Sequence, residues 1–371
     1  MDAFASFLST TADAGDAARE ACGAVRQALG GAAPDLAVVF ATPDLMANAP
    51  GIAAIIQRDL APGALIGCTA EAVAGTGREV EHPPGLSLWA AALPGRAIRA
   101  FTLNPATQAI PVDEGAVILL ADPFGFSPEA LRHADGSALE GAIVGGMASG
   151  GRQPGDHRLG VDGAVLVGGA VGVVVPGARA VVSQGCRPVG PEMTITAGGE
   201  GVIAELAGKP ALQRVREVVE ALPPDERALV DQGVLAGLVV DGNKPQLEQG
   251  DFLIRGIVGG DPESGAIAVG EDVRVGQVMQ LQVRDHASAD ADMRRALAEV
   301  PPGAARGALL FTCNGRGTRM FPDPDHDARV IADVLGPVPM AGMSCNGEIG
   351  PVGGPAHLHG FTATMAIFTS D

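Results

Sequence analysis

Two copies of one tripeptide, Cys-Asn-Gly, are the residues in this chain most suited to chemistry. The first copy spans residues 313–315 and is followed by Arg316; the second spans 345–347 and is followed by Glu348. A thiolate beside a guanidinium has a lowered pKa, so Cys313 is a candidate reactive thiol. The alternative interpretation is that both tripeptides are tight turns in which Asn-Gly supplies a positive φ.

A second charged group surrounds Arg255, which lies in an apolar run (FLIRGIVGGD, residues 252–261), and Arg284. An arginine within an apolar strand must be paired with an acidic residue or must face a ligand. Its planar guanidinium group suits a carboxylate. The alternative is a buried Arg–Asp pair that braces the sheet. Glu71, which follows the run GCTA, is interpreted as an ordinary surface carboxylate.

Standard cofactor and metal signatures are absent from the sequence. His326, His357 and His359 could combine with the cysteines in a zinc site, but no Cys-x2-Cys spacing is present. No phosphate-binding loop, nucleophile elbow or HExxH motif occurs. We therefore expect no metal, no cofactor and no complete catalytic machinery.

The elements that must position these residues recur three times as strand, helix and strand. Such a unit predicts two parallel strands joined by a crossover, with ligands bound beyond the carboxyl ends of the strands. Gly67 and Gly146 lie near such strand ends. Apolar pairs that follow predict hairpins (86–93 with 97–103, and 164–168 with 171–175), so the sheets are expected to be mixed. The three units are 36–42, 51–60 and 64–70; 116–122, 128–138 and 142–149; and 308–314, 326–335 and 338–346.

A turn-rich segment, residues 187–191, divides the chain into two expected domains, 1–187 and 188–371. The second opens with short strands and a helix over 210–222, and a later helix over 288–300 is expected to have Ser288 as its N-cap. The predicted fold class is therefore α/β: two related domains with mixed β-sheets built from repeated strand–helix–strand–hairpin units.

The charge balance of the 371 residues limits the partners. Lys and Arg number 25 and Asp and Glu 43, a net charge of −18, which disfavours nucleic acid and anionic membranes. The longest apolar stretch, residues 163–176, is too short for a membrane-spanning helix. Five widely spaced cysteines form no disulfide framework. We expect a cytoplasmic protein with reduced thiols.

The chain resembles the FIST family, in which an N-terminal and a C-terminal FIST domain stand in tandem. The resemblance covers nearly the whole chain, and its most specific motifs are FLIRGIVGGD (252–261), LFTCNGRG (310–317), GEIGPV (347–352) and HGFT (359–362). It implies a bacterial sensory module of signal transduction that binds small ligands, possibly amino acids.

Taken together, these features predict a small-ligand sensor that passes its signal to a separate partner protein. The alternatives are a cysteine-dependent enzyme or thiol-based redox or electrophile sensor using Cys313, and a protein-interaction scaffold. Small residues on helix faces would also permit homo-oligomers. The candidate ligand-binding residues are Cys313, Asn314, Gly315, Arg316, Gly347, Glu348, Arg255, Arg284, Gly67 and Gly146.

Overall fold

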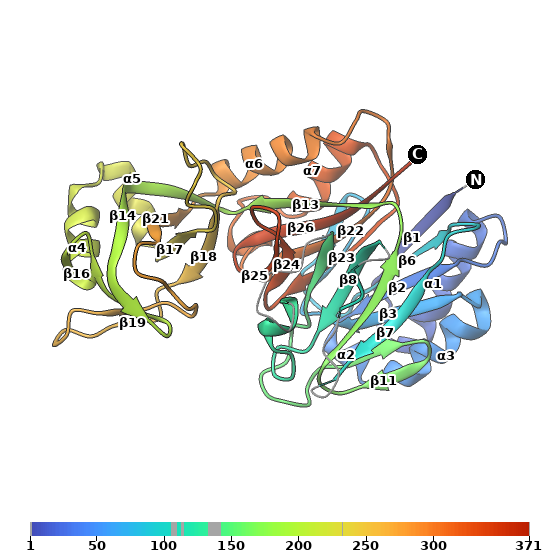
Figure 1. Ribbon diagram of the computed structural model, residues 1–371. Helices are drawn as coiled ribbons and strands as arrows, with labels where there is room; N and C mark the ends of the chain where they lie inside the picture. Colours follow the sequence, from blue (N-terminus) through green and yellow to red (C-terminus); the bar gives the residue numbers. More distant parts are fainter. Residues whose placement is uncertain (1, 105–109, 113–114, 133–141, 232, 371) are drawn as a thin grey trace. The chain divides into compact units, whose positions relative to one another are not determined.

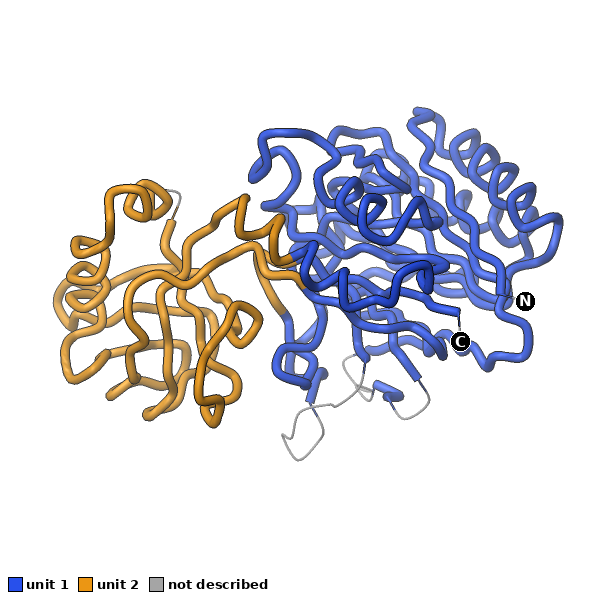
Figure 2. The backbone as a smooth tube through the Cα atoms, turned by 90° about the horizontal axis from the view of Figure 1, so that it is seen from above, with its two compact units in different colours: residues 1–182, 293–358, 363–371 blue, residues 183–292, 359–362 orange. Residues whose placement is uncertain are grey.

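The computed structural model describes residues 2–104, 110–112, 115–132, 142–231 and 233–370. These residues form two compact units (Figure 2): unit 1 comprises 1–182, 293–358 and 363–371, and unit 2 comprises 183–292 and 359–362. The units follow spatial contacts and differ from the sequence halves 1–187 and 188–371, because most of the last 79 residues return to unit 1.

Unit 1 contains the three expected strand–helix–strand units, each with a parallel strand pair (Figure 1). The second expected helix, 128–138, begins with a short 3-10 helix, η2 (Pro128–Leu131), and its residues 133–138 lie outside the described residues. The pairs and the other crossover helices are β2 (Leu36–Ala41), α3 (Ala49–Leu60) and β3 (Ala64–Thr69); β8 (Ala116–Ala121) and β9 (Ile143–Met147); and β22 (Ala305–Cys313), α7 (His326–Leu335) and β23 (Met340–Cys345).

Each parallel pair lies at the centre of a six-stranded mixed sheet, and the three sheets have the same plan. The strand orders are β1-β6-β2-β3-β10-β11, β7-β12-β8-β9-β24-β25 and β13-β26-β22-β23-β4-β5. The fold is thus mixed α/β, as predicted. The added strands are β1 (Ala3–Ser9), β4 (Val73–Gly75), β5 (Arg78–Val80), β6 (Leu86–Ala92), β7 (Arg99–Leu103), β10 (Leu159–Val161), β11 (Ala164–Leu166), β12 (Ala170–Val175), β13 (Ala178–Gln184), β24 (Glu348–Pro351), β25 (Ala356–His359) and β26 (Thr362–Thr369).

The hairpin that follows each parallel pair is donated to another repeat. Hairpin β4–β5 of the first repeat pairs with β23 of the third, β10–β11 of the second pairs with β3 of the first, and β24–β25 of the third pairs with β9 of the second. The exchange forms a closed cycle, so every repeat completes a sheet that is not its own.

The two hairpins expected from the apolar pairs are wrong. Strands β6 and β7 lie in different sheets, and so do β11 and β12. The reason is burial: β6 and β12 are almost entirely buried, so each becomes an interior strand with neighbours on both sides. Their sequence neighbours β7 and β11 are partly exposed and lie at sheet edges.

One face of each sheet contributes to a shared core, to which β2, β8 and β22 all supply side chains. Phe40 and Phe311 meet edge to face, with ring centroids 5.9 Å apart. On the opposite faces, α1 (Ala14–Ala28) and α3 lie side by side over the first sheet (Figure 1), and α7 packs on the third. Burying each large apolar side chain stabilises the fold by about 1.5–3 kcal/mol.

Unit 2 is built around antiparallel strands, which include β14 (Cys186–Gly199), β17 (Val234–Val239), β18 (Phe252–Gly256) and β21 (Val278–Arg284). Helix α4 (Ala211–Ala221), expected over 210–222, packs against this sheet. The expected N-cap Ser288 is wrong. Helix α6 (His286–Ala298) begins two residues earlier, because Asp285 accepts hydrogen bonds from the Ala287 N–H and the Ser288 hydroxyl.

The remaining elements of unit 2 are short. They are β15 (Val202–Leu206), β16 (Lys209–Pro210), α5 (Pro224–Val230), β19 (Gly259–Gly260) and β20 (Ile267–Ala268). Across both units, no helix in the described part of the chain is long and apolar enough to cross a bilayer.

A glycine recurs at one register position of the three repeats, opposite the first strand of each pair. Gly67 pairs with Val39, Gly145 with Leu119 and Gly342 with Leu310. A Cβ on Gly67 would lie 2.4 Å from the Val39 carbonyl oxygen. Close backbone approach therefore requires glycine at Gly67, one of the candidate ligand residues.

We predict that Gly67→Ala destabilises the protein by about 1–3 kcal/mol, the usual cost of overpacking a filled core. The control is Gly23→Ala in α1, where an added Cβ meets nothing within 4 Å and the helix gains about 0.5–1 kcal/mol. Urea unfolding measures the free energy of unfolding of both variants. A Gly67→Ala variant as stable as wild type would contradict the packing argument.

Candidate functional site

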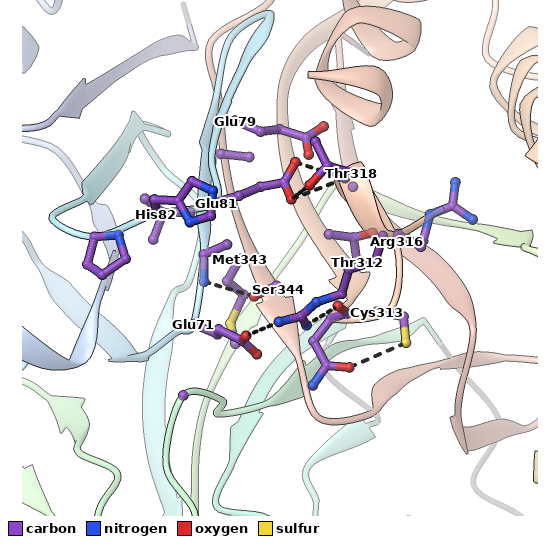
Figure 3. Close-up of a pocket in the computed structure, with 18 of the residues that line it drawn as sticks. Glu71, Glu79, Glu81, His82, Thr312, Cys313, Arg316, Thr318, Met343 and Ser344 are labelled. Atoms are coloured by element: carbon purple, nitrogen blue, oxygen red, sulfur yellow. Dashed lines mark hydrogen bonds and ion pairs between the residues drawn. The ribbon is translucent and has the colours of Figure 1, made fainter. Parts of the chain in front are cut away.

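A pocket of about 370 Å³ lies within unit 1, between hairpin β4–β5 and the carboxyl ends of β22 and β23 (Figure 3). Its walls come from the first and third repeats. The hairpin side supplies Glu71, Glu79, Glu81 and His82, and the strand-end side supplies Thr312, Cys313, Asn314, Arg316, Thr318, Arg319, Met343 and Ser344.

The hairpin is held in place by a reciprocal pair of hydrogen bonds at its base. The Ala72 N–H donates to the Ser344 hydroxyl oxygen, and the Ser344 N–H donates to the Ala72 carbonyl, both at 2.9 Å. The antiparallel pairing of Val73 with Met343 continues from there. Glu79 and Glu81 are two residues apart in an extended segment, and therefore share one face of it.

A buried ion pair forms the rear of the site. Arg316 donates from Nε to Asp327 Oδ2 at 2.7 Å and from Nη2 to Oδ1 at 2.8 Å, and both side chains are about 1% exposed. The Thr312 hydroxyl and His326 Nδ1 also contact this carboxylate. Burial alone would raise the pKa of Asp327, but the guanidinium of Arg316 outweighs it and holds the pKa well below its usual range.

The guanidinium group of Arg316 thus already binds a protein carboxylate. The sequence had predicted that it anchors a ligand. Only Nη1 has no hydrogen-bond partner among the described residues. The ring of Phe321 lies 5.1 Å from the guanidinium carbon and stacks on His326. Arg316 consequently ties the end of β22 to the start of α7.

Two further links cross the pocket itself and are far more exposed. Arg319 binds Glu71 at 2.5 Å and the Asn314 carbonyl at 2.6 Å, with 57% of its side chain exposed. Glu81 accepts hydrogen bonds from the Thr318 N–H and hydroxyl. The sequence predicted neither of these two links across the pocket. Glu71 in particular is predicted there to be an ordinary surface carboxylate. Only the hairpin exchange brings it to Arg319, 248 residues away.

Glu79 is the most perturbed carboxyl group in the pocket. Burial and the nearby charge of Asp327 raise its pKa to about 8, although the Ala328 N–H donates to Oε1 at 2.9 Å and opposes the shift. The protonated form of Glu79 is therefore favoured over that of an ordinary glutamate. No sequence signal pointed to it.

Cys313 is the one partly exposed cysteine among five free thiols; the other four are buried. The Gly315 N–H donates to its sulfur at 3.4 Å, and the guanidinium groups of Arg316 and Arg319 both lie near enough to interact electrostatically with it. Cys345, its partner across the parallel pair, is buried; burial and Glu348 raise the pKa of Cys345 well above its usual range. The chemistry of the pair thus rests on Cys313.

The other candidate residues lie elsewhere in the described chain. Gly146 pairs with Glu348 between β9 and β24, where a Cβ on Gly146 would lie 2.3 Å from the Cys345 sulfur. Gly347 lies at the same junction, directly before β24. In unit 2, Arg255 binds Glu271 at 2.5 Å, in place of the aspartate expected, and Arg284 lies over the Phe361 ring at 5.7 Å.

Comparison with known proteins decides the family. The FIST N domain matches residues 35–209 and the FIST C domain matches residues 211–351. The chain belongs to the FIST family. An uncharacterized protein of Mycobacterium bovis is 46% identical over 386 residues, and one of Mycobacterium tuberculosis is 44% identical over 382; these alignments cover at least 97% of this chain and 98% of each relative. FIST domains are associated with sensing in signal transduction.

The tandem FIST domains share the pocket between them. Its glutamates and His82 lie in the FIST N segment, whereas Cys313, Arg316 and Arg319 lie in the FIST C segment. Among the residues that the structure describes, no group of three or more His, Cys, Asp or Glu side chains is placed to hold a metal ion.

We predict that Asp327→Asn costs about 3–5 kcal/mol, because it leaves Arg316 charged, buried and uncompensated. Asp16→Asn, which breaks the exposed Arg19–Asp16 pair, should cost less than about 1 kcal/mol. Denaturant unfolding at neutral pH compares the free energies of unfolding of the two variants.

The same pair has a pH signature. The pKa of Asp327 is lower in the folded state than in the unfolded chain, so its stabilising contribution is complete above the ordinary aspartate range near about 4 and is lost as the pH falls. Asp327→Asn should lose that acid-dependent part. Equal losses from the two variants, or acid profiles that run parallel, would contradict this role.

Proposed function

We propose that this FIST protein is a cytoplasmic sensor that binds an amino acid or a similar small polar metabolite in the pocket of unit 1. The observation that carries the proposal is the pair of exposed links across the pocket, Arg319 to Glu71 and Thr318 to Glu81. Their groups are complementary to one another, and a ligand with a carboxylate and an amine offers each of them an equivalent partner.

The volume and lining support this assignment. About 370 Å³ is at the lower end for small-molecule sites, where a few polar groups fix the orientation of the ligand. A ligand carboxylate would replace Glu71 at Arg319, and the ligand amine would bind the carboxylates released. Signal output would then require a separate partner protein that recognises the rearranged hairpin.

The expected result of native mass spectrometry is a small noncovalent mass on the freshly purified protein that is lost on denaturation. Thermal shift assays with the standard amino acids then rank ligands. For a ligand so identified, Arg319→Ala should weaken binding by roughly ten- to a hundredfold, the value of a charge-assisted hydrogen bond of about 1.5–3 kcal/mol.

The matched control is Arg19→Ala, which removes an exposed, paired arginine on α1. If Arg319→Ala binds the ligand as tightly as wild type does, the anchor is assigned wrongly. A bare chain that no amino acid stabilises would favour the scaffold alternative over a sensor.

A second candidate function is a thiol-based sensor or cysteine-dependent enzyme, favoured by the exposure of Cys313 inside the pocket and the N–H group directed at its sulfur. A cation and a backbone donor both stabilise a thiolate. In this function an electrophile would enter the same pocket and the Cys313 sulfur would attack it.

We predict that iodoacetamide modifies Cys313 at neutral pH about tenfold or more faster than free cysteine, and the four buried thiols far more slowly. Peptide mapping by mass spectrometry gives the rates. Arg319→Ala should slow the reaction, and Arg19→Ala should not. A Cys313 that reacts at the rate of free cysteine would remove this candidate.

A further inference from the structure

Carboxylates outnumber the available cations in the pocket. Glu71, Glu79 and Glu81 line the hairpin side, against two guanidinium groups on the other side. Asp327 already occupies the fork of Arg316, and Glu71 occupies Arg319. Within the described part of the chain, Glu79 and Glu81 therefore accept hydrogen bonds from neutral donors only, namely the Ala328 N–H, the Thr318 N–H and the Thr318 hydroxyl.

Glu79 has one oxygen left for a ligand. Oε1 accepts from the Ala328 N–H, whereas Oε2 has no hydrogen bond to any described residue. The surrounding elements carry three acidic and three basic groups; Arg316 and His326 both bind Asp327, and Arg78 is exposed to solvent. These groups are Asp325, His326 and Asp327 at the start of α7, Arg316 after β22, and Arg78 and Glu81 on its own segment.

We infer that the positively charged group of the ligand binds beside Glu79, and that Glu79 releases its proton to solvent as the ligand enters; this inference rests on the proposed ligand site. An ammonium group pairs with a carboxylate and not with a neutral carboxyl group. Where an ammonium ion enters as one proton leaves, the net charge beside Glu79 does not change. The exchange avoids burying an uncompensated charge, which is the main cost of ionic binding in a partly buried site.

The opposite orientation makes the opposite prediction. A ligand carboxylate beside Glu79 would keep the carboxyl group protonated, and binding would take up a proton at alkaline pH. Because burial and Asp327 raise the pKa of Glu79 to about 8, the two orientations differ in the sign of the pH dependence near neutrality. Glu79 is thus the residue that selects which end of the ligand points into the hairpin.

Three small probes separate these cases: methylammonium chloride, glycine and sodium acetate, compared at equal ionic strength. Calorimetric titrations in phosphate and in Tris give the number of protons exchanged. For glycine and methylammonium we expect release of one proton, and affinity that rises about tenfold per pH unit from about pH 6 to pH 8 and then levels off. Acetate alone should show neither effect.

Glu79→Gln keeps the acceptor for Ala328 but cannot titrate, so it should abolish proton release and flatten the pH profile. Glu263→Gln, an exposed carboxylate in unit 2, is the matched control and should behave as wild type. Should Glu79→Gln fold poorly, carbon NMR of the Glu79 carboxyl in the wild-type protein provides the same readout. Its titration should move to lower pH when methylammonium is present.

Three results would overturn the inference: binding that does not vary with pH, proton uptake in place of release, or a Glu79 titration that neither amine shifts. If amino acids bind in the pocket with a flat pH profile, the proposed function survives and only the role of Glu79 fails. If no amino acid binds at all, both fail together.

Discussion

The open edge of β23 constrains the rest of the structure. A strand in this position presents unpaired N–H and C=O groups, and hairpin β4–β5 satisfies them from a distant part of the chain. Equivalent hairpins cover β3 and β9, and each comes from a different repeat. No repeat therefore completes its own sheet, and each of the three sheets requires strands from two repeats. Because these contacts join segments far apart in sequence, such a topology is expected to fold slowly.

The pocket results from this exchange of hairpins between repeats. The donated hairpin pairs with Ala341–Met343 of β23, and the cavity lies between its acidic side and the segment that follows β22. The two ion pairs there differ in kind. Arg316 and Asp327 are buried and joined by two hydrogen bonds, and they form the rear wall of the pocket. Arg319 and Glu71 are exposed, where a pair contributes about 0–1 kcal/mol, so a ligand can displace them at little cost.

Local patterns in the sequence were sufficient for the parallel pairs. Continuous apolar runs around Val38, Ile118 and Leu309, each followed by a crossover and a second run, predict three parallel pairs, all of which are present. Such patterns could not predict the order of the strands, because an apolar run such as 86–92 is compatible with any partner strand. Proximity in sequence wrongly favoured hairpins. The pairing was decided by burial on both faces, a tertiary property.

The candidate site was predictable only on one side. Cys313, Asn314 and Arg316 follow a recognisable strand and do line the pocket. Glu79 lies within the three-residue strand β5 and Glu81 directly follows it. Charged residues in so short a run are typical of an exposed turn, and nothing local reveals a distant partner. Asp327 lies in the first turn of α7, within the expected range 326–335, but its pairing with Arg316 depends on how α7 returns to β22.

The tandem arrangement of FIST domains follows from the same geometry. The glutamates come from the FIST N segment, 35–209, and the cysteine and arginines from the FIST C segment, 211–351. In addition, β26 pairs with β22 close to the end of the chain, so unit 1 is closed only after nearly all of the sequence is present. Neither FIST segment alone contains a complete sheet around the pocket or both of its walls. The pocket therefore requires both segments, and the proposed ligand would contact both at once.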